Sequence, residues 1–414
     1  MFKWLFRVIL GGIILAGMSA CTMLGLNYSS LETDNKPEPR PALTADFDLE
    51  QTKLTLEAEL YGPWPGQLPV SASEPRMIDE NYLGGTGTLE EVMLTIGEGE
   101  TARTFPVVLA LPNRAGSEPV PLIISQTFSG NCSVFPNDPV TSPDGDPCSG
   151  SEMGGAVGFI ATNIFGTYIA YAPIERYFEA GLGYASFYGS GFVPDANGAA
   201  QSIMAELEPG PKPTSTLMAW AYGFDAAARI LGKDPRIEET AIAAAGHSRF
   251  GKSALMAAAW SDRIAAAIAH QSGFAGASSS RSTTGETLGR MARSYPHWVR
   301  PGLGAELEDG LELTLDQHYL LALIAPKPIF LGNGRRDVWS DPNSTYRIAQ
   351  AADPVYEARG VEGLPDGTMR TFDPSAEISY WLRVGGHSVV SEDIDAFIDF
   401  MTAHFPTEPD PAGL

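Results

Sequence analysis

The sequence predicts a three-layer α/β sandwich in which helices cover both faces of a mostly parallel sheet. Short apolar runs typical of buried strands alternate with amphipathic helical segments over about 300 residues. The stretch 241–260 has the pattern of a strand, a sharp turn and a helix. A hydrophobic content of 44% in 414 residues supplies enough apolar side chains for a large core. We therefore expect one α/β domain over residues 46–414.

The first strands are expected between residues 92 and 188. Alternating runs at 92–96 and 104–111 flank the turn GEGE, which predicts an antiparallel hairpin at the sheet edge. The apolar run PLIISQ at 121–126 is expected as a core strand. GYASFY at 183–188 is the next strand candidate, and it ends in a loop that contains Asp195.

Helices and strands alternate in the rest of the chain. Residues 216–231 place their apolar side chains on one face and are followed by Gly232, which indicates an amphipathic helix. Residues 274–318 show no clean repeat and are expected as an insertion over the sheet. The other expected segments are strands at 241–245, 264–269, 328–331 and 379–384, an apolar run at 320–324 that leads into the third of these, and helices at 251–260 and 392–405.

The N-terminus predicts a secreted, lipid-anchored protein. Lys3 and Arg7 precede an apolar stretch that is too short to span a bilayer, and MSAC at 18–21 resembles a bacterial lipoprotein cleavage box. Cys21 would become the lipidated first residue, and a plain signal peptide cut near Ala20 is the alternative. Residues 22–45 have the composition of a flexible tether. The expected location is the bacterial cell envelope, on the periplasmic or outer-membrane face.

Charge and cysteine content agree with an extracytoplasmic protein. Removal of residues 1–21 takes away two cations and no acid, so the formal charge moves from −23 to −25, which disfavours nucleic-acid binding. Cys132 and Cys148 lie in a loop rich in Pro, Asp and Gly, and an oxidising compartment favours a disulfide between them. The aspartates in this loop favour solvated turns over a calcium site. These residues are Asp138, Asp144 and Asp146.

A candidate nucleophile, Ser248, lies at the apex of the turn in AIAAAGHSRFGKSAL. A serine between a strand and a helix exposes its hydroxyl near the unpaired N–H groups of the helix N-terminus, which is the arrangement of an α/β-hydrolase. The second glycine of the usual G-x-S-x-G motif is replaced by Phe250. An ordinary turn with a surface serine is the alternative. Arg249 and Lys252 favour the catalytic interpretation, because cations beside the serine suit an oxyanion and an acidic substrate.

The base and the acid are predicted from their positions after strands. Of six histidines, His387 lies in GGHS, directly after the last expected strand, where the base of such folds belongs. Asp337 follows the penultimate strand and is the best candidate for the acid, with a salt bridge to Arg335 or Arg336 as its alternative role. Asp341, before Pro342, is more typical of a turn.

Several motifs in this order resemble carbohydrate esterase family 15, the glucuronoyl esterases. They are GHSRFGKSAL, GETLGRMARSYPHW, DQHYLLALIAPKPIFL, DVWSDP and GGHSV, and the resemblance covers about residues 122–405. It implies an α/β-hydrolase that cleaves esters between 4-O-methyl-glucuronic acid on xylan and alcohols of lignin, without a metal or other cofactor. It also implies site roles: Ser248 as nucleophile, His387 as base, Arg249 as oxyanion stabiliser, and Lys252, Glu286, Trp339 and, less clearly, Trp298 as residues that hold the uronate.

One position departs from the family pattern. Many members carry an acid directly before the Ser-Gly that follows the next strand, whereas this chain has Gln271, so Asp337 has to orient the histidine. The leading hypothesis is a monomeric serine esterase acting on glucuronoyl esters. The alternatives are an acetyl or feruloyl xylan esterase and a lipid-anchored carbohydrate-binding protein with reduced catalysis.

Overall fold

A sheet of ten strands runs through the described residues of the computed structural model, which are 39–113, 118–142, 166–169, 171–207 and 214–407. The strand order is β1-β3-β4-β6-β5-β7-β8-β9-β10, and β2 also pairs with β3. From β6 to β10 all neighbouring strands are parallel, while the pairs from β1 to β6 are antiparallel. The strands are β1 (Val70–Ala72), β2 (Arg76–Asn81), β3 (Gly87–Ile96), β4 (Arg103–Pro112), β5 (Val120–Thr127), β6 (Gly183–Tyr188), β7 (Ile237–His247), β8 (Ala266–His270), β9 (Ile329–Gly334) and β10 (Ile378–Arg383).

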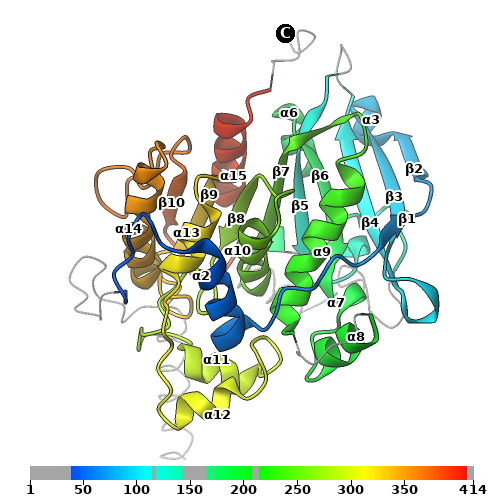
Figure 1. Cartoon of the computed structure of the whole chain (residues 1–414). Coiled ribbons are helices and arrows are strands. Elements are labelled where there is room, and N and C mark those ends of the chain that lie inside the picture. The colour runs from blue at the N-terminus through cyan, green and yellow to red at the C-terminus, as the bar shows by residue number, and fades with distance from the viewer. Residues whose placement is uncertain (1–38, 114–117, 143–165, 170, 208–213, 408–414) are drawn as a thin grey trace, which may run out of the picture.

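Helices cover both faces of the sheet, which confirms the predicted three-layer sandwich (Figure 1). Alternation along the strands divides the core between the two faces. In β4, Val107 and Leu109 belong to the cluster under α9 and α10, whereas Val108 and Ala110 belong to the cluster on the opposite face. The first face carries α2 (Leu49–Leu56), α9 (Thr216–Leu231), α10 (Arg249–Trp260), α13 (His318–Ile324) and α14 (Pro342–Ala358), and the second carries α6 (Ile174–Glu179) and α15 (Ser391–His404).

The remaining helical segments are short. Two of them, α11 and α12, lie within the stretch 274–318 that the sequence predicts as an insertion, and they lie together at the bottom of Figure 1. The short segments are η1 (Glu57–Tyr61), α3 (Tyr82–Gly85), η2 (Gly99–Thr101), η3 (Asn131–Ser133), η4 (Thr167–Ile169), α7 (Gly189–Phe192), α8 (Ala199–Leu207), α11 (Leu288–Ser294) and α12 (Leu303–Glu308).

Three features of the fold differ from the sequence-based expectations. The hairpin β3–β4 is antiparallel as predicted, but it is not the sheet edge, because β1 and β2 both pair with β3. These two strands are short and polar, so they carry little apolar periodicity. Helix α14 was not predicted, although Asp341 caps it by accepting from the Ser344 N–H and Pro342 occupies its first turn. Residues 41–42, inside the predicted tether, accept hydrogen bonds from His318 and Tyr319 of α13.

The predicted leader and part of the cysteine loop lie outside the described residues. These positions include residues 1–21 with Cys21, and also Asp144, Asp146 and Cys148. Secretion, lipidation and the Cys132–Cys148 disulfide therefore stay predictions. Within the part of the chain that the structure describes, no helix is both long enough and apolar enough to cross a bilayer.

Candidate active site

Ser248 occupies a sharp elbow between β7 and α10. Its backbone has φ 56° and ψ −123°, a conformation that costs an L-residue roughly 1–3 kcal/mol and is found where function requires it. The Ser248 N–H donates to the carbonyl of His270 at the end of β8, at 2.9 Å. The elbow is thereby tied to the neighbouring strand, and the serine is only partly buried.

Two glycines make this elbow possible, although their spacing differs from G-x-S-x-G. A Cβ on Gly246 would lie 2.3 Å from the backbone carbon and oxygen of Phe250. A Cβ on Gly251 would lie 2.9 Å from the Gly246 carbonyl oxygen. Phe250 itself turns its ring into the core, where it contacts the rings of Phe128 and Trp220 at centroid distances of 4.9 and 5.0 Å. The close approach therefore needs glycine at 246 and tolerates a large side chain two residues after the serine.

The structure brings His387 and Asp337 together after β10 and β9. His387 Nδ1 lies 2.8 Å from Asp337 Oδ2, and the Ser340 N–H donates to the other carboxylate oxygen at 3.2 Å. Burial alone would raise the pKa of Asp337, but the charge of His387 and the hydrogen bonds from His387 and Ser340 outweigh it and lower the pKa. The ionised carboxylate can therefore hold the imidazole with Nδ1 protonated and Nε2 free to accept a proton.

Ser248 and His387 lie at the same edge of the sheet. The imidazole of His247, the residue before the serine, packs against that of His387 with ring centroids 4.5 Å apart. Within the described residues no hydrogen bond joins the Ser248 hydroxyl to the His387 imidazole. Such bonds are often long in the absence of substrate and shorten in the reacting complex. The predicted nucleophile and the predicted base thus follow neighbouring elements at one edge of the sheet.

The alternative roles considered for the aspartates are resolved by geometry. Asp337 is 2% exposed and pairs with His387, whereas the backbone N–H groups of Arg335 and Arg336 donate to the carbonyls of Arg383 and Gly385. Asp341 is the N-cap of α14, which matches the local, turn-forming role expected for it.

Gln271, which directly precedes Ser272 and Gly273, supports the loop of the histidine. Its Nε2 donates to the carbonyl of Gly386 at 2.8 Å, and the residue is 1% exposed. The Gly334 α-carbon faces this contact so closely that a Cβ there would lie 2.7 Å from Gln271 Nε2. The amide therefore fixes the backbone beside His387, while Asp337 supplies the charge.

A pocket beside Ser248 collects the residues predicted to bind substrate. Its lining consists of Ser248, Arg249, Lys252, Gln271, Gly273, Glu286, Tyr295, Trp298, Trp339 and Ser340. Two of its residues are buried charges of opposite sign, Lys252 and Glu286, and Trp339 is 45% exposed, so it offers an indole surface at the mouth. Such a combination of polar groups and an aromatic surface suits a polyhydroxylated ring.

Burial shifts the ionisation of Lys252 and Glu286 in opposite directions. The Lys252 ammonium donates to the carbonyls of Ser272 and Phe274, each at 2.6 Å, and burial lowers its pKa to about 8 despite the nearby carboxylates of Glu286 and Asp337. Burial raises the pKa of Glu286, and Lys252 only partly offsets this effect. The third N–H of Lys252 is left for a ligand.

Arg249 is held over the pocket by aromatic rings and by an aspartate. Its guanidinium carbon lies 4.8 Å from the centre of the Phe128 ring and 5.5 Å from that of Trp298, and its Nε lies 3.3 Å from Asp195 Oδ2. The other oxygen of Asp195 accepts from His297 and from the Trp298 indole, both at 2.7 Å. Asp195 thus orients two pocket residues at once.

Sequence reasoning located Asp195 only in the loop after a predicted strand and assigned it no role. Tyr295, whose ring stacks on Trp298 at 4.0 Å, was also missed. The available signal was position: an acid that follows the carboxyl end of a strand lies at the edge where Ser248 lies.

Metal-binding side chains are not gathered anywhere in the described ranges. No group of three or more His, Cys, Asp or Glu residues there could hold a metal ion. Asp138 is half-buried and Cys132 lies 3.4 Å from the Ser142 hydroxyl.

Comparisons with known proteins point to one family. Residues 160–360 match the family described as "Glucuronyl esterase, fungi". Carbohydrate esterase MZ0003, from an unknown prokaryotic organism, is 28% identical over 403 residues, which cover 92% of each protein. The structure of a promiscuous CE15 esterase from the marine bacterial metagenome covers 91% of this chain and 99% of its own, with 26% identity and a TM-score of 0.77. A glucuronoyl esterase from Solibacter usitatus is 27% identical, with coverages of 86% and 91% and a TM-score of 0.72.

Proposed function

We propose that this chain, which belongs to carbohydrate esterase family 15, is a serine esterase that hydrolyses esters of 4-O-methyl-glucuronic or glucuronic acid. The ester links between glucuronoxylan and lignin are the natural substrates that this activity fits. One observation carries the proposal: the His387–Asp337 pair and the strained elbow of Ser248 lie at the same sheet edge as a pocket with Lys252 and Glu286.

The proposed reaction proceeds through an acyl-enzyme on Ser248. The Ser248 oxygen attacks the ester carbonyl while His387 Nε2 takes its proton, and Asp337 stabilises the resulting imidazolium. When the tetrahedral intermediate collapses, the bond to the alcohol oxygen breaks and His387 returns the proton to that oxygen. Water then attacks the acyl-enzyme with His387 as base again, and the uronic acid and free Ser248 are released.

The oxyanion of each tetrahedral intermediate would be stabilised from the start of α10. The backbone N–H of Arg249 opens that helix directly after Ser248, where N–H groups lack partners in the helix and the helix dipole is positive. The Arg249 guanidinium, held by Asp195 and the aromatic rings, adds a positive charge beside the same atom.

The uronate ring would be recognised by the pocket next to the serine. Lys252 can donate to a ring hydroxyl while Glu286 accepts from its neighbour, and the exposed indole of Trp339 covers an apolar sugar face. The buried Trp298 supports this surface through its hydrogen bond to Asp195.

The test is the substitution Ser248→Ala, compared with Ser253→Ala in the same helix. Ser253 is buried and donates to the Arg249 carbonyl at 3.1 Å, so its variant controls for the loss of a hydroxyl in α10. We expect Ser248→Ala to abolish release of benzyl alcohol from benzyl glucuronate and covalent labelling by a fluorophosphonate, while Ser253→Ala retains both. Turnover by Ser248→Ala at the wild-type rate would contradict the proposed mechanism.

The same assay separates the alternative functions. An acetyl or feruloyl xylan esterase would release acetate or ferulate from xylan faster than it cleaves the glucuronate ester, and Glu286→Gln would then leave activity unchanged. A carbohydrate-binding protein without catalysis would leave Ser248 unlabelled by the fluorophosphonate.

The cellular location is proposed from residues 1–21. A signal peptide that ends before Cys21 would export the enzyme, and a lipid on Cys21 would hold it in the cell envelope as a monomer at the end of its tether. Its substrate, carried on a plant polymer, would then be cleaved outside the cytoplasm.

A further inference from the structure

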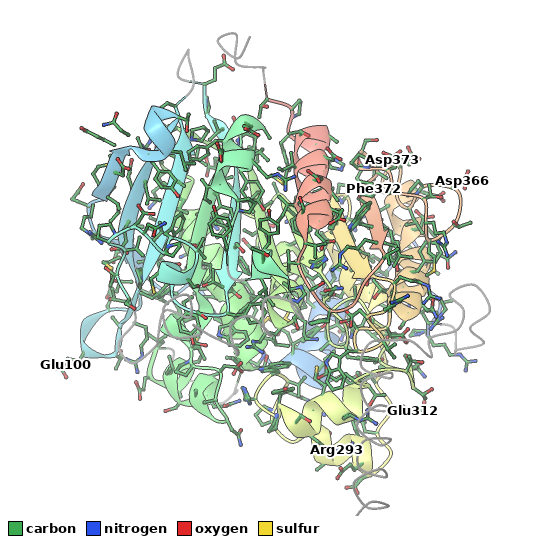
Figure 2. All side chains as sticks on the ribbon, turned by 180° about the vertical axis from the view of Figure 1, so that it is seen from behind. Glu100, Arg293, Glu312, Asp366, Phe372 and Asp373 are labelled. Atoms are coloured by element: carbon green, nitrogen blue, oxygen red, sulfur yellow. The ribbon has the colours of Figure 1, made fainter. Side chains whose placement is uncertain are left out.

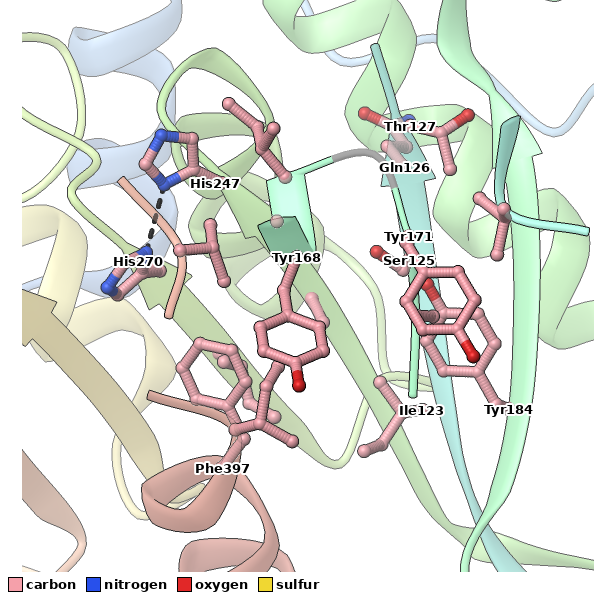
Figure 3. Close-up of a pocket in the computed structure, with 18 of the residues that line it drawn as sticks. Ile123, Ser125, Gln126, Thr127, Tyr168, Tyr171, Tyr184, His247, His270 and Phe397 are labelled. Carbon is pink, nitrogen blue, oxygen red and sulfur yellow. Dashed lines mark hydrogen bonds between the residues drawn. The ribbon is translucent and has the colours of Figure 1, made fainter. Parts of the chain in front are cut away.

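His270, at the end of β8, contacts both chain segments that carry the proposed reaction. Its carbonyl accepts the Ser248 N–H at 2.9 Å. Its imidazole Nδ1 lies 2.9 Å from Nδ1 of His247, and its Nε2 lies 3.3 Å from Asp393 Oδ1 in the first turn of α15. Figure 3 shows the two imidazoles joined by this contact, and the Phe397 ring lies near that of His270. One residue therefore lies between the elbow of Ser248 and the helix that follows His387.

The His270 imidazole is closely packed between β9 and α15. A Cβ on Gly332 of β9 would lie 2.4 Å from His270 Cδ2, so only glycine leaves room for the ring there. From the other side the Phe397 ring meets it edge-on, with centroids 5.5 Å apart. His270 is 1% exposed and cannot change rotamer without displacing β9 or α15.

Asp393 links His270 to the strand that precedes His387. It is fully buried and accepts from Arg383 Nε at 2.7 Å and from the Trp381 indole at 3.0 Å, both on β10. It also caps α15 by accepting from the Val390 N–H at 3.0 Å. The ends of β10 and α15 are thus joined through one carboxylate.

Arg383 extends this link to both sides of His387. Its guanidinium donates to the carbonyl of Val384 at 3.1 Å and to the Ser388 hydroxyl at 2.9 Å, and it also contacts the Ser388 carbonyl. Its contact to the Gly386 carbonyl is longer, at 3.4 Å. The loop that carries His387 is therefore fixed at positions before and after the histidine.

The charges of Arg383 and Asp393 are paired with each other. Burial by itself would raise the pKa of Asp393, but His270, Arg383 and the Val390 N–H lower it to about 2, so the carboxylate stays ionised. Burial, together with His387, His270, Arg383 and Arg249, keeps the pKa of His247 well below its usual value. The ring that packs on His387 is therefore neutral. A buried ion pair seldom adds net stability to a protein. We therefore attribute to the pair of Arg383 and Asp393 a role in fixing the positions of neighbouring residues.

We propose that His270 is a positioning residue that couples the nucleophile elbow to the loop of the general base, acting through Asp393 and Arg383. Its carbonyl fixes Ser248, and its imidazole fixes the helix and loop that hold His387, so the distance between the serine oxygen and the imidazole depends on it. This inference rests on the proposed function, because it assigns a role in the reaction of Ser248 and His387.

The test compares two substitutions of His270 that differ in reach. In His270→Gln the side-chain amide reaches the position of Nε2 and can still contact Asp393, whereas in His270→Asn it reaches only the position of Nδ1. Asp393→Asn removes the charge without changing the shape. Asp225→Asn is the matched control, since Asp225 is 5% exposed and pairs with Arg229 at 2.7 Å in α9, away from the site.

The readouts are the rate of Ser248 labelling by a fluorophosphonate, kcat and KM for benzyl glucuronate, and the thermal midpoint. We expect His270→Asn and Asp393→Asn to lower both the labelling rate and kcat by about ten- to a hundredfold with little change in KM, because small misplacements of reacting groups cost that much. His270→Gln should retain more activity than His270→Asn. Asp225→Asn should lower the thermal midpoint and leave the labelling rate unchanged.

Ser388→Ala is a milder variant that tests the same inference if the His270 and Asp393 variants do not fold. It removes one acceptor of Arg383 from the His387 loop, and we expect it to fold and to lower the labelling rate several-fold. Wild-type labelling rates in Ser388→Ala or in the folded His270 variants would overturn the inference and leave the proposed function intact. Absence of label on Ser248 in the wild type would overturn the proposed function, and the inference with it.

Discussion

Individual side chains at this site gain their properties from burial and from partners of opposite charge. Asp195 has a pKa below its usual value, because the hydrogen bonds from His297 and Trp298 and the charges of Arg249 and His297 outweigh the effect of burial. Lys252 and Glu286 are each at least 96% buried, and this burial lowers the pKa of Lys252 and raises the pKa of Glu286. Perturbed groups gathered in one pocket are typical of sites that bind and transform a ligand.

Asp195→Asn tests whether this carboxylate orients Arg249. The amide keeps the size of the side chain but removes the charge that faces the guanidinium, so we expect kcat to fall by about tenfold while the protein stays folded. The measurement is kcat and KM on benzyl glucuronate. Glu308→Gln, which removes an exposed ion pair with Arg293 at 3.2 Å, is the control and should have no effect. An unchanged kcat in Asp195→Asn would show that the rings alone hold Arg249.

Lys252 predicts a pH dependence of substrate binding. Since its pKa is about 8, the ammonium loses its proton as the pH rises through that value, and with it the charge available to a uronate ester. We expect KM to rise between pH 7 and pH 9 by up to about tenfold, in line with the loss of one charged hydrogen bond. Lys252→Gln should show a raised KM that no longer varies over this range. A constant KM in the wild type would contradict the predicted role.

At the scale of elements, the site depends on where strands end and helices begin. β7 and α10 meet at Ser248, β8 ends at His270, β9 leads to Asp337 and β10 leads to His387. Because β7 to β10 are parallel, all four ends lie at one edge of the sheet. The elements thus gather at one edge residues that are far apart in the sequence.

The close packing of β7 against α10 can be tested with Gly246→Ala. The added methyl group would lie 2.3 Å from the backbone of Phe250, so we expect a loss of about 3 kcal/mol or more in the free energy of unfolding, or a displaced elbow. Urea unfolding and fluorophosphonate labelling measure the two outcomes. In α11, a Cβ on Gly289 approaches nothing closer than 3.9 Å, so Gly289→Ala should change stability by at most about 1 kcal/mol and leave labelling intact.

At the scale of the whole molecule, the protein has a strong negative net charge and is built on a single sheet. Charged side chains such as Glu100, Glu312 and Asp366 project at its periphery in Figure 2 and are exposed. The formal charge of −23 disfavours contact with nucleic acids and with anionic surfaces. A protein with this negative charge would need a separate anchor to stay at a membrane, and we propose that residues 1–21 direct the attachment of that anchor.

Cys21→Ala tests that proposal. We expect the wild type to incorporate radiolabelled palmitate in a bacterial host and to fractionate with membranes, because one cysteine carries the predicted lipid. Cys21→Ala should lose the label and appear in the soluble extracytoplasmic fraction, with kcat on benzyl glucuronate unchanged. Equal palmitate incorporation in both proteins would contradict the lipidation of Cys21.

Much of the fold and the proposed triad follows from local features of the sequence. Apolar runs and amphipathic periods predicted the central strands and the long helices α9 and α15. They missed β1 and β2, which are short and polar, and they also missed α14, although its amphipathic pattern is at least as clear as that of α15. Ser248, Asp337 and His387 were placed by one rule, that residues after parallel strands meet at one edge. That rule needs only the positions of the strands along the chain, which local hydrophobic patterns indicate.

By itself, the sequence determined the α/β class, the elbow and the three residues expected to meet there, because backbone preferences and hydrophobic periods act over a few residues. Only the tertiary structure decided which partners those residues have. Asp195 contacts a histidine 102 positions away, and His270 of β8 contacts Asp393 of α15. Contacts of this kind depend on strand register and on the space that residues such as Gly332 leave open, and both are properties of the packed molecule.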